Sequence, residues 1–148
     1  MERIHPDSGG PVLVKTPTVD TFCITYLKSG PGWVEAEFRP DERYRNNFGL
    51  VQGGVLGVYL DNIMGQSCYT LLGNDKSIST MTMNLQFLEP APMGVIKGTA
   101  RVTKQGSRVF FAEGELQDTA RKDLARATGT FLILDRKHAQ GPRSDKTK

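Results

Sequence analysis

Histidine is almost absent from this sequence, whose 148 residues include only His5 and His138. Both lie in terminal segments that we expect to be outside the folded body. A body without histidine excludes a Ser-His-Asp triad, a Cys-His pair and a His-ligated zinc site, unless a terminal segment folds back. Acid–base chemistry is therefore expected to rest on carboxylates and amides.

Cysteine is equally scarce. Cys23 and Cys68 are the only two, and they lie in different apolar segments. This separation predicts two buried thiols, which form neither a disulfide nor a metal site. We expect no metal and no redox cofactor.

Long apolar runs and a strongly charged body are also missing. No stretch is long enough to span a membrane, and the first twenty residues lack the apolar core of a signal peptide. We therefore expect a cytoplasmic protein without a membrane partner. The net charge is +3, and residues 135–148 hold five Arg or Lys against two Asp, which accounts for the whole excess (5 − 2 = 3). The near-neutral remainder disfavours nucleic-acid binding.

The length suits one domain with a core of its own. Gly- and Pro-rich composition predicts a flexible N-terminal arm at residues 1–17. A single folded domain is expected at residues 18–135, followed by a disordered basic tail at residues 136–148.

Apolar residues are concentrated between Leu50 and Leu72, where they occupy nearly every side of a predicted helix. A helix of this kind is typically buried along its length and surrounded by the rest of the fold. A glycine pair, Gly53 and Gly54, lies at its start. Asp61 lies in its middle, and burial of a carboxylate is costly unless the group is paired or used.

Six stretches have the composition or the alternation of β-strands, at residues 21–27, 33–38, 78–88, 95–104, 108–118 and 123–134. The predicted order is β-β-α-β-β-β-β, an α+β fold with a sheet curled around one long central helix. Short turns between the last four strands predict an antiparallel meander. An edge strand is commonly covered by pairing across a two-fold axis, so we expect at least a dimer.

Residues 78–88 alternate most clearly. One predicted face carries the larger apolar side chains and is expected to belong to the core: Met81, Met83, Leu85 and Phe87. The other carries Thr80, Thr82, Asn84 and Gln86.

Several short motifs occur in a fixed order: Asn46, VQGG at residues 51–54, Asp61, TMTMNLQFLEPAPMG at 80–94, KQGSR at 104–108 and ATGTFLIL at 127–134. Over residues 21–134 this series resembles the PaaI-like branch of the hotdog-fold acyl-CoA thioesterases. The resemblance implies the hotdog fold and hydrolysis of acyl-CoA-type thioesters by a homodimer or homotetramer. Coenzyme A would enter as part of the substrate.

The resemblance assigns Asp61 as the carboxylate that attacks the thioester or activates water for that attack. A carboxylate removed from water is a better base, which supports this role. The alternative is a structural Asp, paired with an Arg or capping a neighbouring backbone.

Gly53 and Gly54 permit close approach of the backbone at the helix start. The free N–H of Gly53, at the positive end of the helix dipole, is expected to hold the thioester oxygen as it gains charge. In the expected arrangement this N–H comes from one subunit and Asp61 from its neighbour, with Gly54 beside the substrate. The alternative is simple packing of helix against sheet.

Asn46, Gln52 and Thr80 are assigned orienting roles by the same resemblance. The family usually has His-Gly-Gly where this chain has Gln52 before the glycine pair. A Gln side chain exchanges hydrogen bonds but carries no proton charge near neutral pH, so it can orient but not act as an acid or base. Asn46 can equally form a turn, Gln52 can be an ordinary polar residue at a helix start, and Thr80 an exposed strand residue.

Lys104 and Arg108 flank Gly106 in a predicted tight turn. Cations placed there suit the phosphates of coenzyme A, although charged hairpin turns also simply favour solubility.

Two other functions are compatible with the same fold. A hotdog protein that binds an acyl or other small apolar ligand without turnover is the main alternative, because Gln52 replaces the usual His. A hotdog dehydratase depends on an active-site His, which the predicted body lacks.

Overall fold

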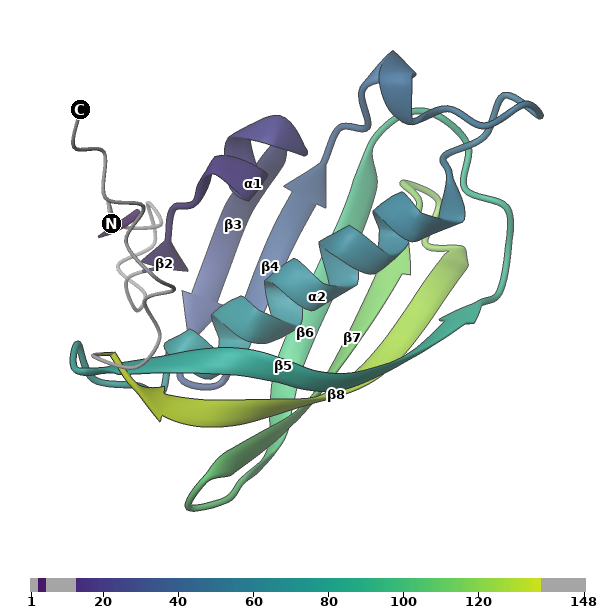
Figure 1. The fold of residues 1–148 in the computed structure, drawn as a ribbon. Coiled ribbons are helices and arrows are strands. Elements are labelled where there is room, and N and C mark those ends of the chain that lie inside the picture. Colours follow the sequence, from purple (N-terminus) through teal and green to yellow (C-terminus); the bar gives the residue numbers. More distant parts are fainter. Residues whose placement is uncertain (1–2, 5–12, 137–148) are drawn as a thin grey trace, which may run out of the picture.

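The computed structural model describes residues 3–4 and 13–136 of the chain. Its largest element is a six-stranded antiparallel sheet with the strand order β3-β4-β6-β7-β8-β5. The strands are β3 (Ile24–Gly30), β4 (Trp33–Phe38), β5 (Lys76–Phe87), β6 (Ile96–Gln105), β7 (Val109–Gln117) and β8 (Asp123–Asp135). One long helix, α2 (Gly53–Tyr69), lies across the face around which the sheet curls (Figure 1). The α+β hotdog architecture expected from the sequence is confirmed.

The core lies between α2 and the sheet. Leu60, Ile63 and Met64 of the helix are 0% exposed, and they meet the inward-facing residues of the strands. Gly98 permits the close approach, since a Cβ added there would lie 2.6 Å from the Phe38 ring and 3.0 Å from Ile63. Among the described residues, no helix combines the length and apolar character needed to cross a membrane.

The alternation predicted for β4 is confirmed by its burial. Val34, Ala36 and Phe38 are buried, whereas Trp33 is exposed. The phenyl ring of Phe38 stacks on Tyr59 of α2 with ring centroids 4.2 Å apart.

The predicted four-stranded meander is wrong at its first strand. Strands β6, β7 and β8 do form a meander, but β5 pairs with β8 and not with β6. The connection between β5 and β6 contains Pro90 and Pro92 and passes over the start of α2 (Figure 1). It is fastened there because the Val51 N–H donates to the Ala91 carbonyl over 2.9 Å. The segment crosses the helix instead of turning back as a hairpin.

The apolar stripe predicted on β5 is largely exposed and not part of the core. Met81 and Phe87 are each 56% exposed and Met83 is 36% exposed, while only Leu85 is partly buried against the core. The reason is the position of β5 at the edge of the sheet, where it pairs on one side only.

The first predicted strand is displaced toward the C-terminus. A short helix, α1 (Pro17–Thr21), occupies its expected start, with Pro17 at a position that favours helix initiation. Cys23 follows with a φ of 53° and is exposed, so the prediction that both thiols are buried holds only for Cys68.

The termini are described in part. Strands β1 (Arg3–Ile4) and β2 (Leu13–Val14) pair with each other, β2 contacts α2, and Leu13 is 0% exposed. The expected flexible arm therefore includes one buried residue. The Arg136 N–H donates to the Asp75 carbonyl over 2.9 Å. The remainder of the expected basic tail, residues 137–148, lies outside the described residues.

Candidate active site around Asp61

One face of α2 is almost free of side chains. Gly53, Gly57, Asp61 and Gly65 are spaced four residues apart and therefore share a face. That face lies against β5: a Cβ added to Gly53 would meet the Phe87 ring at 3.2 Å. A Cβ on Gly57 would meet Leu85 at 3.2 Å, and one on Gly65 would meet Ile78 at 3.5 Å. Asp61 is thus the only charged group that the helix presents to this strand, while Tyr69 at the end of the helix shares a hydrogen bond of 2.9 Å with Ser77 of β5.

The Asp61 carboxylate is bound by the hydroxyl of Thr80, which donates to Oδ1 over 2.9 Å. Asp61 is half-buried and Thr80 is exposed. No cation forms an ion pair with Asp61 anywhere in the described part of the chain. The structural alternative of an Arg-paired Asp is therefore not what the structure contains.

Thr80 points to the helix because β5 contains a bulge. The pairing with β8 shifts between Thr80 and Thr82, so Met81 is an extra residue without a partner. Thr82 instead donates to, or accepts from, the hydroxyl of Thr130 over 2.7 Å. The predicted common face for Thr80 and Thr82 is wrong, because an extra residue inverts the alternation on one side of it.

The start of α2 presents free backbone donors. Neither the N–H of Gly53 nor that of Gly54 donates a hydrogen bond to any described residue. A Cβ added to Gly54 would meet nothing within 4 Å, so the space beside this backbone is open. The preceding Gln52 is exposed, and its own N–H donates to the Tyr44 carbonyl over 2.8 Å. Its side chain makes no capping hydrogen bond.

Asn46 organises the loop before the helix. Its carboxamide oxygen accepts from the N–H of Phe48 over 2.9 Å and from that of Leu50 over 3.1 Å. The carboxamide oxygen of Asn46 therefore has the turn-forming role that we considered as the alternative to orienting the substrate. The loop holds Phe48 outward, where it is 80% exposed.

The predicted site residues form three separate groups within one chain. Gly53 and Asp61 are eight residues apart on the same helix, which corresponds to about 12 Å along its axis. Lys104 and Arg108 lie at the tip of the β6–β7 hairpin, near the other end of α2 (Figure 1). Gly32 links the end of α2 to β6 here. Its N–H donates to Thr70 Oγ1, which follows α2, and its carbonyl accepts from the N–H of Val102 in β6, both over 2.7 Å. The Gly53 N–H and Asp61 of one chain therefore cannot contact the same carbonyl group.

The described residues offer neither a reactive buried thiol nor a metal site. Burial raises the pKa of the Cys68 thiol to about 12, so this thiol stays neutral and unreactive at ordinary pH. Within residues 3–4 and 13–136, no group of three His, Cys, Asp or Glu side chains is placed to hold a metal ion.

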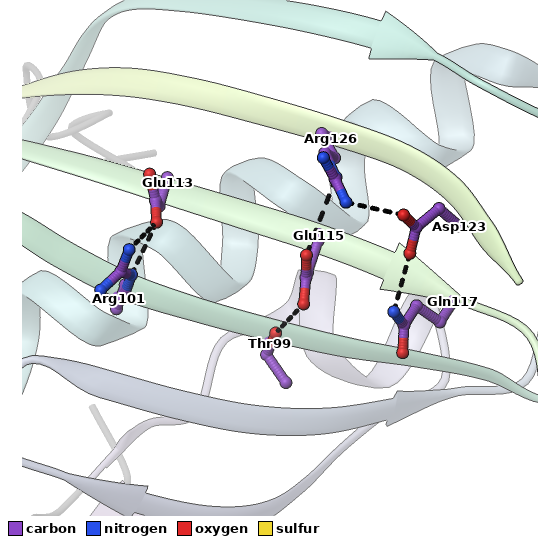
Figure 2. Close-up of polar contacts among 7 residues, drawn as sticks. All are labelled: Thr99, Arg101, Glu113, Glu115, Gln117, Asp123 and Arg126. Atoms are coloured by element: carbon purple, nitrogen blue, oxygen red, sulfur yellow. Dashed lines mark hydrogen bonds and ion pairs between the residues drawn. The ribbon is translucent and has the colours of Figure 1, made fainter. Parts of the chain in front are cut away.

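A hollow of about 580 Å³ lies on the sheet face away from α2. Figure 2 shows the polar network on this face, where Arg101 pairs with Glu113, and Arg126 lies between Glu115 and Asp123. Asp61 and Thr80 line neither this hollow nor the two smaller ones of about 440 and 470 Å³. Sequence reasoning missed this face because its charges are scattered over four strands.

Comparison with known proteins places the chain in a family. Residues 48–125 match the model of the thioesterase superfamily. The acyl-coenzyme A thioesterase 13 proteins of Homo sapiens and Pongo abelii are each 32% identical to the chain over 116 residues. The match covers 76% of this chain and 76% of each relative.

Solved structures agree with the architecture. A phenylacetic acid degradation-related protein of Ralstonia eutropha superposes with a TM-score of 0.76 at 31% identity, over 80% of this chain and 92% of the other. The PaaI protein of E. coli has a TM-score of 0.76 at 17% identity, over 81% and 86%, and shares the fold. The chain belongs to the thioesterase superfamily, whose reaction class, thioester hydrolysis, is the one predicted from its sequence.

Proposed function

We propose that the protein hydrolyses acyl-CoA thioesters, with Asp61 as the nucleophile or general base. The observation that carries the proposal is a half-buried carboxylate that has no cationic partner among the described residues and accepts a hydrogen bond from Thr80. The similarity of the chain to acyl-coenzyme A thioesterase 13 supports coenzyme A as the leaving group.

The reaction needs a donor for the carbonyl oxygen and a base for water. The free N–H of Gly53 donates a hydrogen bond to that oxygen and stabilises its developing negative charge, and one such donor is typically worth about 10²–10³ in rate. Asp61 takes a proton from water, the hydroxide attacks the carbonyl carbon, and the carbon–sulfur bond breaks. The sulfur leaves as a thiol once it is protonated, and the acyl group leaves as a carboxylic acid. In the covalent variant Asp61 attacks first and water then hydrolyses the anhydride, with the same products.

The active site is proposed to form between two copies of the chain. The separation of about 12 Å between Gly53 and Asp61 along one helix requires the second group to come from a partner. Strand β5 offers the contact, because its twelve residues pair only with β8 and present the exposed apolar side chains of Met81, Met83 and Phe87. A dimer, alone or within a tetramer, covers this edge.

In this arrangement Gln52 orients the substrate and Asn46 holds the loop that precedes the helix start. Neither group carries a proton charge, so proton transfer falls to Asp61. A cytoplasmic location and an absence of nucleic-acid partners stay predictions from the sequence.

The test is release of free thiol from a panel of acyl-CoAs that differ in chain length and aromaticity. We expect turnover by the wild-type protein, loss of turnover in Asp61→Asn, and wild-type rates in Asp20→Asn, an exposed carboxylate on α1. Wild-type rates in Asp61→Asn would refute the assigned role. If no acyl-CoA is cleaved but one of them raises the melting temperature, the protein is a ligand-binding member of the fold.

The dimer is tested by sedimentation. Met81→Glu places a charge on the exposed edge and is expected to dissociate the dimer and abolish turnover together. Phe111→Glu alters a side chain of similar exposure, 42%, on the outer face of β7 and is expected to leave the pair intact. A fully active monomer contradicts the shared site.

A further inference from the structure

Trp33 is the only tryptophan of the chain and begins β4, directly after the turn of the β3–β4 hairpin. Its indole lies against the backbone of Gly30, since a Cβ added to Gly30 would be 2.3 Å from Nε1. The side chain is nevertheless 38% exposed. An indole held against a backbone with part of its surface open to solvent is a ready platform for a flat ring.

Trp33 borders a groove of about 470 Å³ with a basic lining. The groove is formed by Pro31, Gly32, Trp33, Leu71 and residues 101–105. Its charged members are Arg101 and Lys104, and no carboxylate lines it. Lys104 has no ion-pair partner within the described part of the chain, whereas Arg101 pairs with Glu113. An unpaired cation beside an exposed aromatic ring suits a ligand that has both a phosphate and a base.

The adjacent outer hollow does not suit such a ligand. Trp33 and Arg101 border it too, but its lining holds three carboxylates, Glu35, Glu113 and Glu115, against two arginines. Those arginines are already occupied by the ion pairs of Figure 2. A phosphate is therefore favoured in the groove and disfavoured in the hollow.

The groove lies at a useful distance from Asp61. The hydrogen bond from the Gly32 N–H to Thr70 Oγ1, 2.7 Å long, fastens the hairpin to the end of α2. Tyr69, the last residue of α2, follows Asp61 by eight residues, which is about 12 Å at the helical rise, and Leu71 of the groove lining comes two residues later. The long pantetheine arm of coenzyme A separates the thioester from the nucleotide over a span of this kind.

We propose that this groove binds the phosphorylated adenine nucleotide of coenzyme A, with the base stacked on Trp33 and a phosphate on Lys104. The proposal rests on the proposed function, and it adds the ring of Trp33 to Lys104, one of the two cations that the sequence predicted for this role. It assigns the nucleotide to the same chain that supplies Asp61.

The direct test uses adenosine 3′,5′-bisphosphate, the nucleotide end of coenzyme A without arm or acyl group. Because Trp33 is the only tryptophan, its fluorescence reports on this position alone. We expect saturable quenching that weakens as salt rises, since an exposed ion pair is screened. An absence of quenching, or quenching that is unchanged by salt, would overturn the proposal.

Variants locate the two contacts by calorimetry. Trp33→Leu is expected to raise the Kd of the bisphosphate by about fivefold or more, because base stacking on an aromatic ring is worth roughly 1–3 kcal/mol. Lys104→Gln is expected to weaken binding as well. Lys97→Gln makes the same exchange outside the groove on the same strand and should bind as wild type. Equal weakening by both lysine variants would show a general charge effect and refute the site.

Kinetics separate this inference from the catalytic one. Trp33→Leu should raise KM for an acyl-CoA at unchanged kcat, as expected for binding energy that is uniform along the reaction. The same variant should cleave an acyl-N-acetylcysteamine, which lacks the nucleotide, at the wild-type rate. Equal losses on both substrates would refute a nucleotide contact. If the wild-type protein cleaves neither substrate yet the bisphosphate quenches Trp33, the nucleotide site stands and the hydrolase proposal fails.

Discussion

Thr80 donates a hydrogen bond of 2.9 Å to the Asp61 carboxylate, and it reaches this residue only because Met81 is an unpaired extra residue in β5. Bulges commonly re-aim a side chain next to an active site. The contact fixes one carboxylate oxygen, Oδ1, and no hydrogen bond from the described residues occupies the other.

Removing the Thr80 hydroxyl should lower the rate and leave the fold intact. A hydrogen bond to a charged group is worth about 1.5–3 kcal/mol, so we expect Thr80→Val to lower kcat/KM by roughly tenfold or more. Thr80→Ser keeps the donor and should retain most activity. Thr82→Val removes a hydroxyl on the opposite face of the same strand, which is bonded to Thr130, and should be active. Equal activity of the two valine variants would argue against orientation of Asp61 by Thr80.

A methyl group at Gly54 should block the substrate and not the fold. The added Cβ meets nothing within 4 Å, and alanine is the better helix former, so the free energy of unfolding should stay the same or rise by up to about 1 kcal/mol. Activity should fall because the acyl-CoA approaches the backbone there. Gly65→Ala, which meets Ile78 at an ordinary 3.5 Å, provides the control on the same helix. Retention of the wild-type kcat/KM by Gly54→Ala would remove this residue from the site.

The Tyr59 hydroxyl should be dispensable for stability. It is buried without a hydrogen-bond partner among the described residues, and burial raises the pKa of this hydroxyl well above its ordinary value. Because an unsatisfied buried polar group costs about 1–3 kcal/mol, Tyr59→Phe should raise the free energy of unfolding measured in urea. Tyr26→Phe should lower it, since the Tyr26 hydroxyl donates to Asn62 Oδ1 over 2.8 Å. A loss of stability in Tyr59→Phe would mean that its hydroxyl has a partner in solution.

The two thiols should differ in reactivity and in their effect on alkaline stability. An aromatic disulfide reagent should modify the exposed Cys23 in the native protein and reach the buried Cys68 only after unfolding. Burial raises the pKa of Cys68 from 9.0 to about 12, so its contribution to stability is complete below pH 9 and is lost as pH rises toward 12. The free energy of unfolding should therefore fall over this range, and less steeply in Cys68→Ala. An identical slope in both proteins would contradict the assignment.

Much of the fold follows from local pattern. The long apolar helix, its glycine start and the alternation of β4 predicted where the core would lie, because side chains of these elements face their neighbours at fixed periods. The strand boundaries of β6, β7 and β8 also agree with the predicted ranges to within one residue at every end. The pairing of β5 did not follow, since chain order alone does not reveal that the proline-containing link crosses the helix start.

The candidate site divides in the same way. The sequence by itself determined that a lone carboxylate, Asp61, lies on an apolar helix behind two glycines, and this pattern, with the resemblance, sufficed to predict a thioester hydrolase. Only the tertiary structure decided that Thr80 meets Asp61 and that β5 leaves apolar side chains at an open edge. The physical reason is that a bulge and a strand partner each depend on a second segment, whereas periodicity, composition and a distance along one helix belong to one segment alone.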